Sequence, residues 1–205
     1  MTKDKLIELI EKIADKIEIE KQYLTDLDSE IADGDHGINM ARGFGAVKEK
    51  LASLKDKDCG TVLKTVGMTL VSTVGGAAGP LYGTAFMKAG AVCAGKEELD
   101  GDDFINIMEA AIEGVKMRGK SDKGEKTMLD SMIPAYEAFK SELENGDVKS
   151  AMRKTLNASQ EGVEYTKTIV ATKGRASYIG QRSLGHQDPG ATSFTYMIEC
   201  LYDIL

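Results

Sequence analysis

The sequence predicts an all-α fold in one domain that covers residues 1–205. Apolar residues recur at spacings of three, four and seven along most of the chain, which is the period of a helix with one buried face. A strand-like run is limited to residues 165–170. Hydrophobic residues make up 42% of the chain and charged residues 29%, as in ordinary globular proteins, so a core can form without disulfides.

Four of about eight helices are expected in the first half of the chain. Their ranges are residues 2–24, 36–55, 61–74 and 85–94. Their inward stripes include Ile10, Ile13 and Ile17 in the first, Phe44, Val47 and Leu51 in the second, and Leu63, Val66 and Leu70 in the third. Asp-Gly-Asp and His-Gly are turn formers, so the stretch from Asp28 to Asp35 is expected to be a loop. The glycine-rich residues 75–84 are expected to form a second loop, in which the backbone carries few large side chains.

The other four helices are expected over residues 104–115, 128–139, 148–172 and 189–201. Asp102 or Asp103 is the expected N-cap of the first, and a polar loop over residues 120–126 separates it from the second. Asn-Gly-Asp at 145–147 stops one helix and starts the next. Asp188 followed by Pro189 starts the last helix, because aspartate caps helices and proline suits their first turn.

The composition excludes some function classes. The net charge is −7 and no basic stripe is present, which argues against binding to nucleic acid. No run approaches the roughly 18 apolar residues of a membrane span, so no membrane partner is expected. The three cysteines lie far apart and are odd in number, which favours a reducing compartment. We therefore expect a cytoplasmic protein.

Asp28, Asp33 and Asp35 are the candidate metal ligands. Carboxylates that converge in a short stretch repel one another unless a cation or a proton neutralises them. The spacing is not that of an EF-hand loop, which also needs a closing glutamate. Magnesium suits the pattern, because it takes few protein carboxylates together with phosphate oxygens and water. The alternative is a polar connection in which Asp33 or Asp35 only caps the next helix.

Other segments suggest an anion site, each with a structural alternative. His36 and Asn39 lie at the start of a predicted helix, where free N–H groups favour a phosphate, although a lone histidine is more often structural. The glycine-rich residues 75–84 lack the lysine and the strand of a P-loop, so they are a weak signal alone. Arg175 suits a phosphate or a helix end equally well.

Four motifs occur in order along nearly the whole chain. They cover residues 27–29 with 33–40, 75–84, 173–178 and 185–190, and include Asp-Gly-Asp-His-Gly at 33–37 and His-Gln-Asp-Pro-Gly at 186–190. In this combination the chain resembles the L subunits of the dihydroxyacetone kinase family. The resemblance implies an antiparallel barrel of eight helices that holds ADP or ATP at one end through two magnesium ions.

The resemblance also implies roles for individual residues. The metal ligands are Asp28, Asp33 and Asp35, and the nucleotide-binding residues are His36, Gly37, Ile38, Asn39, Met40, Ala77, Ala78, Gly119, Met128, Arg175, Asp188, Pro189 and Gly190. Among these, Gly119 and Met128 are expected beside the adenine. Many family members carry serine at the position of Ala78, so here only backbone N–H groups are left to contact a phosphate.

The same resemblance implies partners. A separate K subunit would hold dihydroxyacetone, and the separate subunit favours a phosphohistidine protein of the phosphotransferase system as donor, with free ATP as the alternative. A homodimer is a further candidate assembly. Two other functions stay open at this point: the nucleotide domain of a fatty-acid kinase, whose chains carry long additional domains, and a regulatory module that reports its ADP state to a transcription factor.

Overall fold

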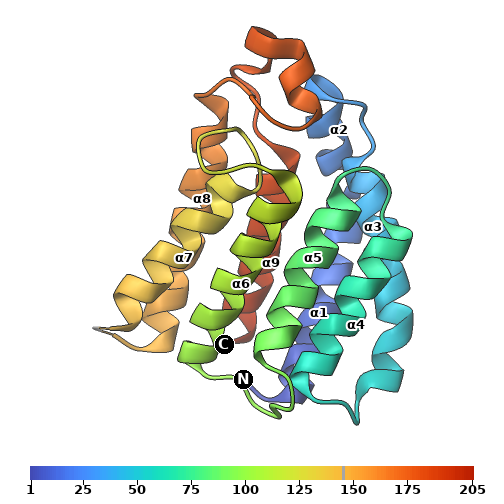
Figure 1. Cartoon of the computed structure of the whole chain (residues 1–205), viewed down its shortest axis with the longest axis vertical. Helices are drawn as coiled ribbons and strands as arrows, with labels where there is room; N and C mark the ends of the chain where they lie inside the picture. The colour runs from blue at the N-terminus through green and yellow to red at the C-terminus, as the bar shows by residue number, and fades with distance from the viewer. Residues whose placement is uncertain (145) are drawn as a thin grey trace.

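The computed structural model describes residues 1–144 and 146–205, and these residues are mainly helical (Figure 1). The elements are α1 Lys3–Ile19, α2 Lys21–Ile31, α3 His36–Lys50, η1 Leu51–Leu54, α4 Cys59–Thr73, α5 Ala78–Val92, α6 Gly101–Gly119, α7 Leu129–Leu143, α8 Val148–Lys167, η2 Arg175–Ser183 and α9 Pro189–Ile204, where η marks a 3₁₀ helix. Over the described ranges the only β pairing is an isolated bridge between Thr2 and Glu98. The all-α prediction is confirmed.

The α-helices form a closed ring. Packing runs from α1 to α3, α4, α5, α6, α7, α8 and α9, and α9 packs back against α1. Neighbours in the ring run in opposite directions, so it is an antiparallel barrel of eight helices, as the family resemblance implies (Figure 1). The ninth helix, α2, continues from α1 at one end and packs on α3 and α9. Both chain termini lie at the opposite end (Figure 1).

The inward stripes of the ring helices meet in one core. Ile10, Ile17, Phe44, Leu70 and Leu129 are all less than 2% exposed. Burying each such side chain contributes about 1.5–3 kcal/mol, so the stripes hold the ring closed. The core surrounds an apolar cavity of about 500 Å³. No helix in the described part of the chain has the length and apolarity to cross a bilayer.

Asp28 lies in a helix, so the loop predicted for it is wrong. The first predicted helix continues past Leu24, with a break only at Glu20, and α2 ends at Ile31. Leu24, Asp28 and Ile31 are the buried positions of α2, so Asp28 occupies a place in the apolar stripe. A carboxylate there interrupts the hydrophobic pattern, which is why the pattern placed the end of the helix too early.

The predicted glycine loop is also too long, because α5 begins at Ala78 and not at Ala85. Gly83 lies within α5, against the backbone of α4, where an added Cβ would come within 2.8 Å of the carbonyl oxygen of Gly67. A Cβ on Gly67 would in turn lie 2.6 Å from the carbonyl oxygen of Gly83. These glycines therefore permit close helix packing and do not end a helix.

Two further helix ends differ from the prediction. The N-cap of α6 is Asp100, because its side chain accepts from the N–H of Asp103, and Asp103 returns the bond in a capping box. The predicted caps, Asp102 and Asp103, are the second and third residues of the helix. Helix α8 ends at Lys167 and not near residue 172. Of the predicted break at 145–147, Asn145 lies outside the described residues, and Asp147 caps α8.

We predict that Gly67→Ala lowers the free energy of unfolding by about 1–3 kcal/mol, because the new methyl group would force α4 and α5 apart. Urea denaturation measures the change. The matched control is Gly45→Ala in the exposed face of α3, where nothing lies within 4 Å of the new Cβ. Since alanine favours the helix, the control should gain up to about 1 kcal/mol. Equal stability of the two variants would contradict the packing argument.

Candidate functional site

The loops at the end of the barrel away from the termini surround a cavity of about 490 Å³. Its wall comes from five segments that are far apart in sequence. They are residues 28–39, 75–82, 115–128, 173–176 and 188–190. Four of the segments belong to the motifs of the sequence analysis, which the closure of the ring brings together at this end. The cavity is therefore the candidate site.

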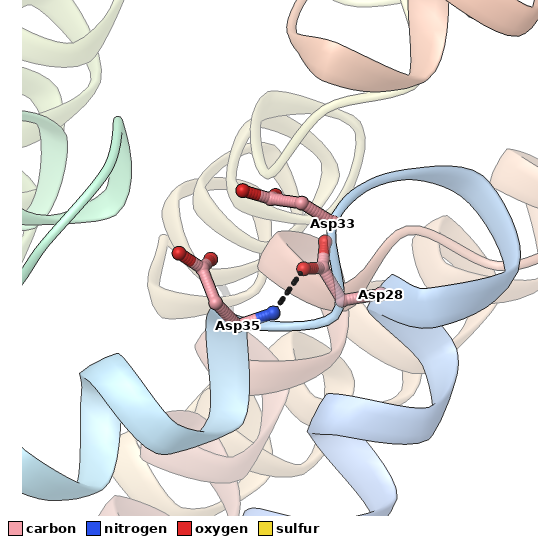
Figure 2. Close-up of side chains that lie close together, drawn as sticks. All are labelled: Asp28, Asp33 and Asp35. Atoms are coloured by element: carbon pink, nitrogen blue, oxygen red, sulfur yellow. Dashed lines mark hydrogen bonds between the residues drawn. The ribbon is translucent and has the colours of Figure 1, made fainter.

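Asp28, Asp33 and Asp35 converge on one side of this cavity (Figure 2). One oxygen from each carboxylate lies within 4.8 Å of the other two. Asp28 comes from the last turn of α2, Asp33 from the connection, and Asp35 from the N-cap of α3. Gly34 makes the sharp turn between them with φ +70°, a conformation that favours glycine. The local chain geometry thus aims three side chains at one point.

The electrostatics of this cluster favour a bound cation. Burial raises the pKa of the Asp28 carboxyl, and the negative charges of Asp33 and Asp35 raise it further. The backbone N–H groups of Asp35 and His36 oppose this rise, because they donate to Asp28 Oδ2 at 2.9 and 3.2 Å. Arg175 Nη1 lies 2.9 Å from Asp33 Oδ2 and balances part of the charge. A few carboxylates beside room for phosphate and water form the donor set that magnesium prefers, so the residues fit this metal.

The alternative role of Asp35 as a helix cap is not supported. Asp35 stands at the N-cap position of α3, but its side chain makes no capping hydrogen bond. The carboxylate of Asp28 instead accepts from the first N–H groups at this helix end. The side chain of Asp35 extends toward the same side as that of Asp33 (Figure 2), and one of its oxygens belongs to the cluster of three carboxylates.

His36 is buried at the start of α3 and is neutral at physiological pH. Its Nε2 lies 2.9 Å from Ser193 Oγ on α9, and Ser193 Oγ lies 2.8 Å from the hydroxyl of Tyr82 on α5. Burial lowers the pKa of His36 to about 4. Any attraction of this helix end for an anion consequently comes from backbone N–H groups and not from an imidazolium.

Most of the predicted nucleotide-binding residues line the cavity. These are His36, Asn39, Ala77, Ala78, Gly119, Met128, Arg175, Asp188, Pro189 and Gly190. Three others do not. Gly37 packs on α2, where a Cβ would lie 2.0 Å from the carbonyl oxygen of Lys21, Ile38 is 51% exposed, and Met40 lies in the core. The roles of these three residues in binding stay predictions.

The floor of the cavity is the N-terminus of α9. Asp188 Oδ2 accepts from the N–H of Ala191 at 2.7 Å, so Asp188 caps the helix as predicted. The carbonyl oxygen of Gly190 accepts from Tyr82 Oη at 3.1 Å. Burial raises the pKa of Asp188 to about 7, although the Ala191 N–H opposes the rise. Asp188 therefore changes charge near neutral pH.

Several wall residues were not singled out from the sequence. Tyr82, Arg118, Lys126 and Thr127 all face the cavity. Lys126 is the last residue of the polar connection predicted over residues 120–126, and Thr127 follows it. Burial of a lysine depends on contacts with distant segments, so no local pattern could have identified it.

Most of the chain matches a known domain family. The profile of the DAK2 domain matches residues 30–203, which include all five wall segments except the first residues of the first. The chain belongs to the DAK2 domain family. Its relatives include the ADP-binding subunit DhaL of the PEP-dependent dihydroxyacetone kinase of Escherichia coli, 42% identical over 98% of this chain and 96% of the relative. The ADP-binding subunit DhaL of the PTS-dependent enzyme of Lactococcus lactis is 39% identical over 100% of this chain and 99% of the relative.

A solved structure has the same fold. The dihydroxyacetone kinase of C. freundii, in complex with AMP-PNP and Mg²⁺, superimposes with a TM-score of 0.74 over 99% of this chain at 22% identity. This chain spans 34% of that longer chain. The curated relatives place this chain in a family of kinase subunits.

We predict that Asp188 makes the nucleotide-free protein less stable as pH rises. The folded state keeps the carboxyl proton up to about pH 7, whereas the unfolded chain releases it near the ordinary pKa of 3.8, so stability falls between these values. Asp188→Asn still caps α9 but does not titrate. Its stability relative to wild type, measured by urea denaturation with a chelator, should rise with pH by up to about 1.4 kcal/mol per unit. A difference that is constant from pH 4 to 8 would contradict the assignment.

Proposed function

We propose that this chain is the ADP-binding subunit of a dihydroxyacetone kinase. In this role it relays a phosphoryl group from a phosphohistidine donor protein of the phosphotransferase system to dihydroxyacetone held on a separate K subunit. The printed names of the relatives support the class of reaction. The observation that carries the proposal is the convergence of Asp28, Asp33 and Asp35 on a cavity of nucleotide size.

The carboxylates would hold two magnesium ions, which supply positive charge to the phosphates when bound. The N-terminus of α5 reaches the cavity wall at Ala78, whereas the N–H of His36 at the N-terminus of α3 already donates to Asp28 Oδ2. The first N–H groups of a helix have no partner within the helix and attract anions. The backbone of the first turn of α5 can therefore donate to a phosphate although Ala78 has no hydroxyl group.

The remaining wall residues would orient the nucleotide. Gly119 and Met128 lie on the wall between α6 and α7, which suits an adenine ring. Arg175 already pairs with Asp33 and lies at the mouth, where its guanidinium suits a phosphate. Asp188, Pro189 and Gly190 form the floor. These residues bind and position, so the chemistry at the acceptor hydroxyl belongs to the K subunit.

The proposal extends to the assembly. The whole of residues 1–205 would form one ADP/ATP-binding domain that works in the cytoplasm, with ADP retained as a coenzyme between turnovers. Free ATP is the alternative donor, and a homodimer is the alternative to a single copy bound to the K subunit. Supplying the K subunit with either phosphorylated donor protein or ATP distinguishes the two donors.

We predict that Asp33→Asn lowers the affinity for ADP in the presence of Mg²⁺ by about 30-fold or more, because it removes one of the three clustered carboxylate charges. Titration calorimetry measures the affinity, and phosphotransfer to dihydroxyacetone with the K subunit and donor protein should fall in parallel. The control is Asp26→Asn on the exposed face of α2, where the carboxylate accepts from Gln22 Nε2 at 2.8 Å. Wild-type affinity in the Asp33 variant would sink the proposed site.

A further inference from the structure

Lys126 is a fully buried lysine that is not among the residues proposed to bind the nucleotide or the metal. It is 1% exposed and ranks among the largest buried side chains of the described residues. Its backbone has φ +61°, in the left-handed region that residues other than glycine rarely adopt. Buried charge and backbone strain both cost free energy and persist only where the surroundings hold them in place.

The ammonium group of Lys126 joins two other segments of the chain. It donates to the carbonyl oxygens of Thr166 and His186, and to that of Ile169 at 3.4 Å. Thr166 lies in the last turn of α8, whose carbonyl groups have no partner within the helix and favour a cation. His186 lies in the segment that leads into the floor at Asp188.

The connection between α6 and α7, which carries Lys126, has a conformation that directs this side chain into the protein interior. The carboxylate of Asp130 accepts from the N–H of Gly124 at 2.5 Å and from that of Thr127 at 2.8 Å. Gly124 also has a positive φ, of +89°. The chain therefore turns around Asp130, which buries the Lys126 side chain beside Thr127 and Met128 in the cavity wall.

Other bonds already join the end of α8 to the floor. The N–H of Asp188 donates to Thr166 Oγ1 at 2.9 Å, and the N–H of Gly185 donates to the carbonyl oxygen of Lys167 at 2.8 Å. These two bonds do not involve the part of the wall that carries Met128. Lys126, two residues before Met128, connects that part of the wall to the end of α8 at Thr166 and to the segment before the floor at His186.

We propose that Lys126 is a positioning residue that fixes the Met128 wall relative to the floor at Asp188–Gly190, and so sets the width of the base side of the nucleotide cavity. The proposal rests on the proposed function. It places the effect of Lys126 on the base and ribose of the nucleotide, whereas Asp28, Asp33 and Asp35 act on the phosphates through metal.

The test compares two ligands, ADP and inorganic pyrophosphate, each titrated with Mg²⁺ into wild type and Lys126→Met. Methionine keeps the length and volume of the stem but removes the donor. We expect the affinity for ADP to fall by about 10-fold or more, in line with the loss of buried charged hydrogen bonds, and the affinity for pyrophosphate by less than about 3-fold. The matched control is Lys123→Met, an exposed lysine of the same loop that pairs with Glu137 and does not line the cavity.

Each outcome has a fixed meaning. Equal losses for both ligands, or no loss for ADP, would overturn the proposal, because a merely structural lysine does not distinguish the ligands. If Lys126→Met does not fold, Lys126→Gln, which keeps an N–H donor on a shorter stem, should show the same pattern with a smaller loss. Failure of both variants to fold assigns Lys126 to folding and overturns the proposal. If the wild-type protein binds neither ADP nor pyrophosphate in the presence of Mg²⁺, this result instead contradicts the proposed function.

Discussion

The mutual repulsion of three carboxylates is the constraint on which the site depends. Asp28 is buried in the last turn of α2, and the fold brings Asp33 and Asp35 within 4.8 Å of it. Two backbone N–H groups and Arg175 offset part of the negative charge. Because burial and like charges both raise the pKa of Asp28, the cluster is strained as an anion and suits a divalent cation.

The closed ring makes this arrangement possible. Eight antiparallel helices supply most of the main core, to which the end connections add only a few residues such as Val74 and Met128. The loops opposite the termini are thus free to hold polar groups, and the ring fixes how far apart they stand. Tyr82 shows the coupling, since it packs in the core and bonds to both Ser193 and the floor at Gly190. A rigid barrel with polar ends therefore positions the site without building it into the core.

The helical period and the turn residues predicted the fold class and the positions of most helices. They failed where a residue had a tertiary role. Asp28 stands in an apolar stripe, and Gly83 permits helix contact, so neither marked a helix end. The family resemblance supplied the nucleotide-binding residues, ten of which line the cavity. For the three aspartates, charge patterning alone left helix capping as an alternative to metal binding. Lys126 was missed because its carbonyl partners lie far away in sequence.

The central claim is that the three aspartates hold the metal that carries the nucleotide. The most direct test is a crystal of the protein grown with ADP and Mn²⁺, measured at the manganese absorption edge. The account predicts anomalous density between the carboxylates of Asp28, Asp33 and Asp35, in contact with the phosphates of an ADP molecule whose base lies toward Met128. Manganese elsewhere, or ADP bound without a metal at these carboxylates, would contradict it.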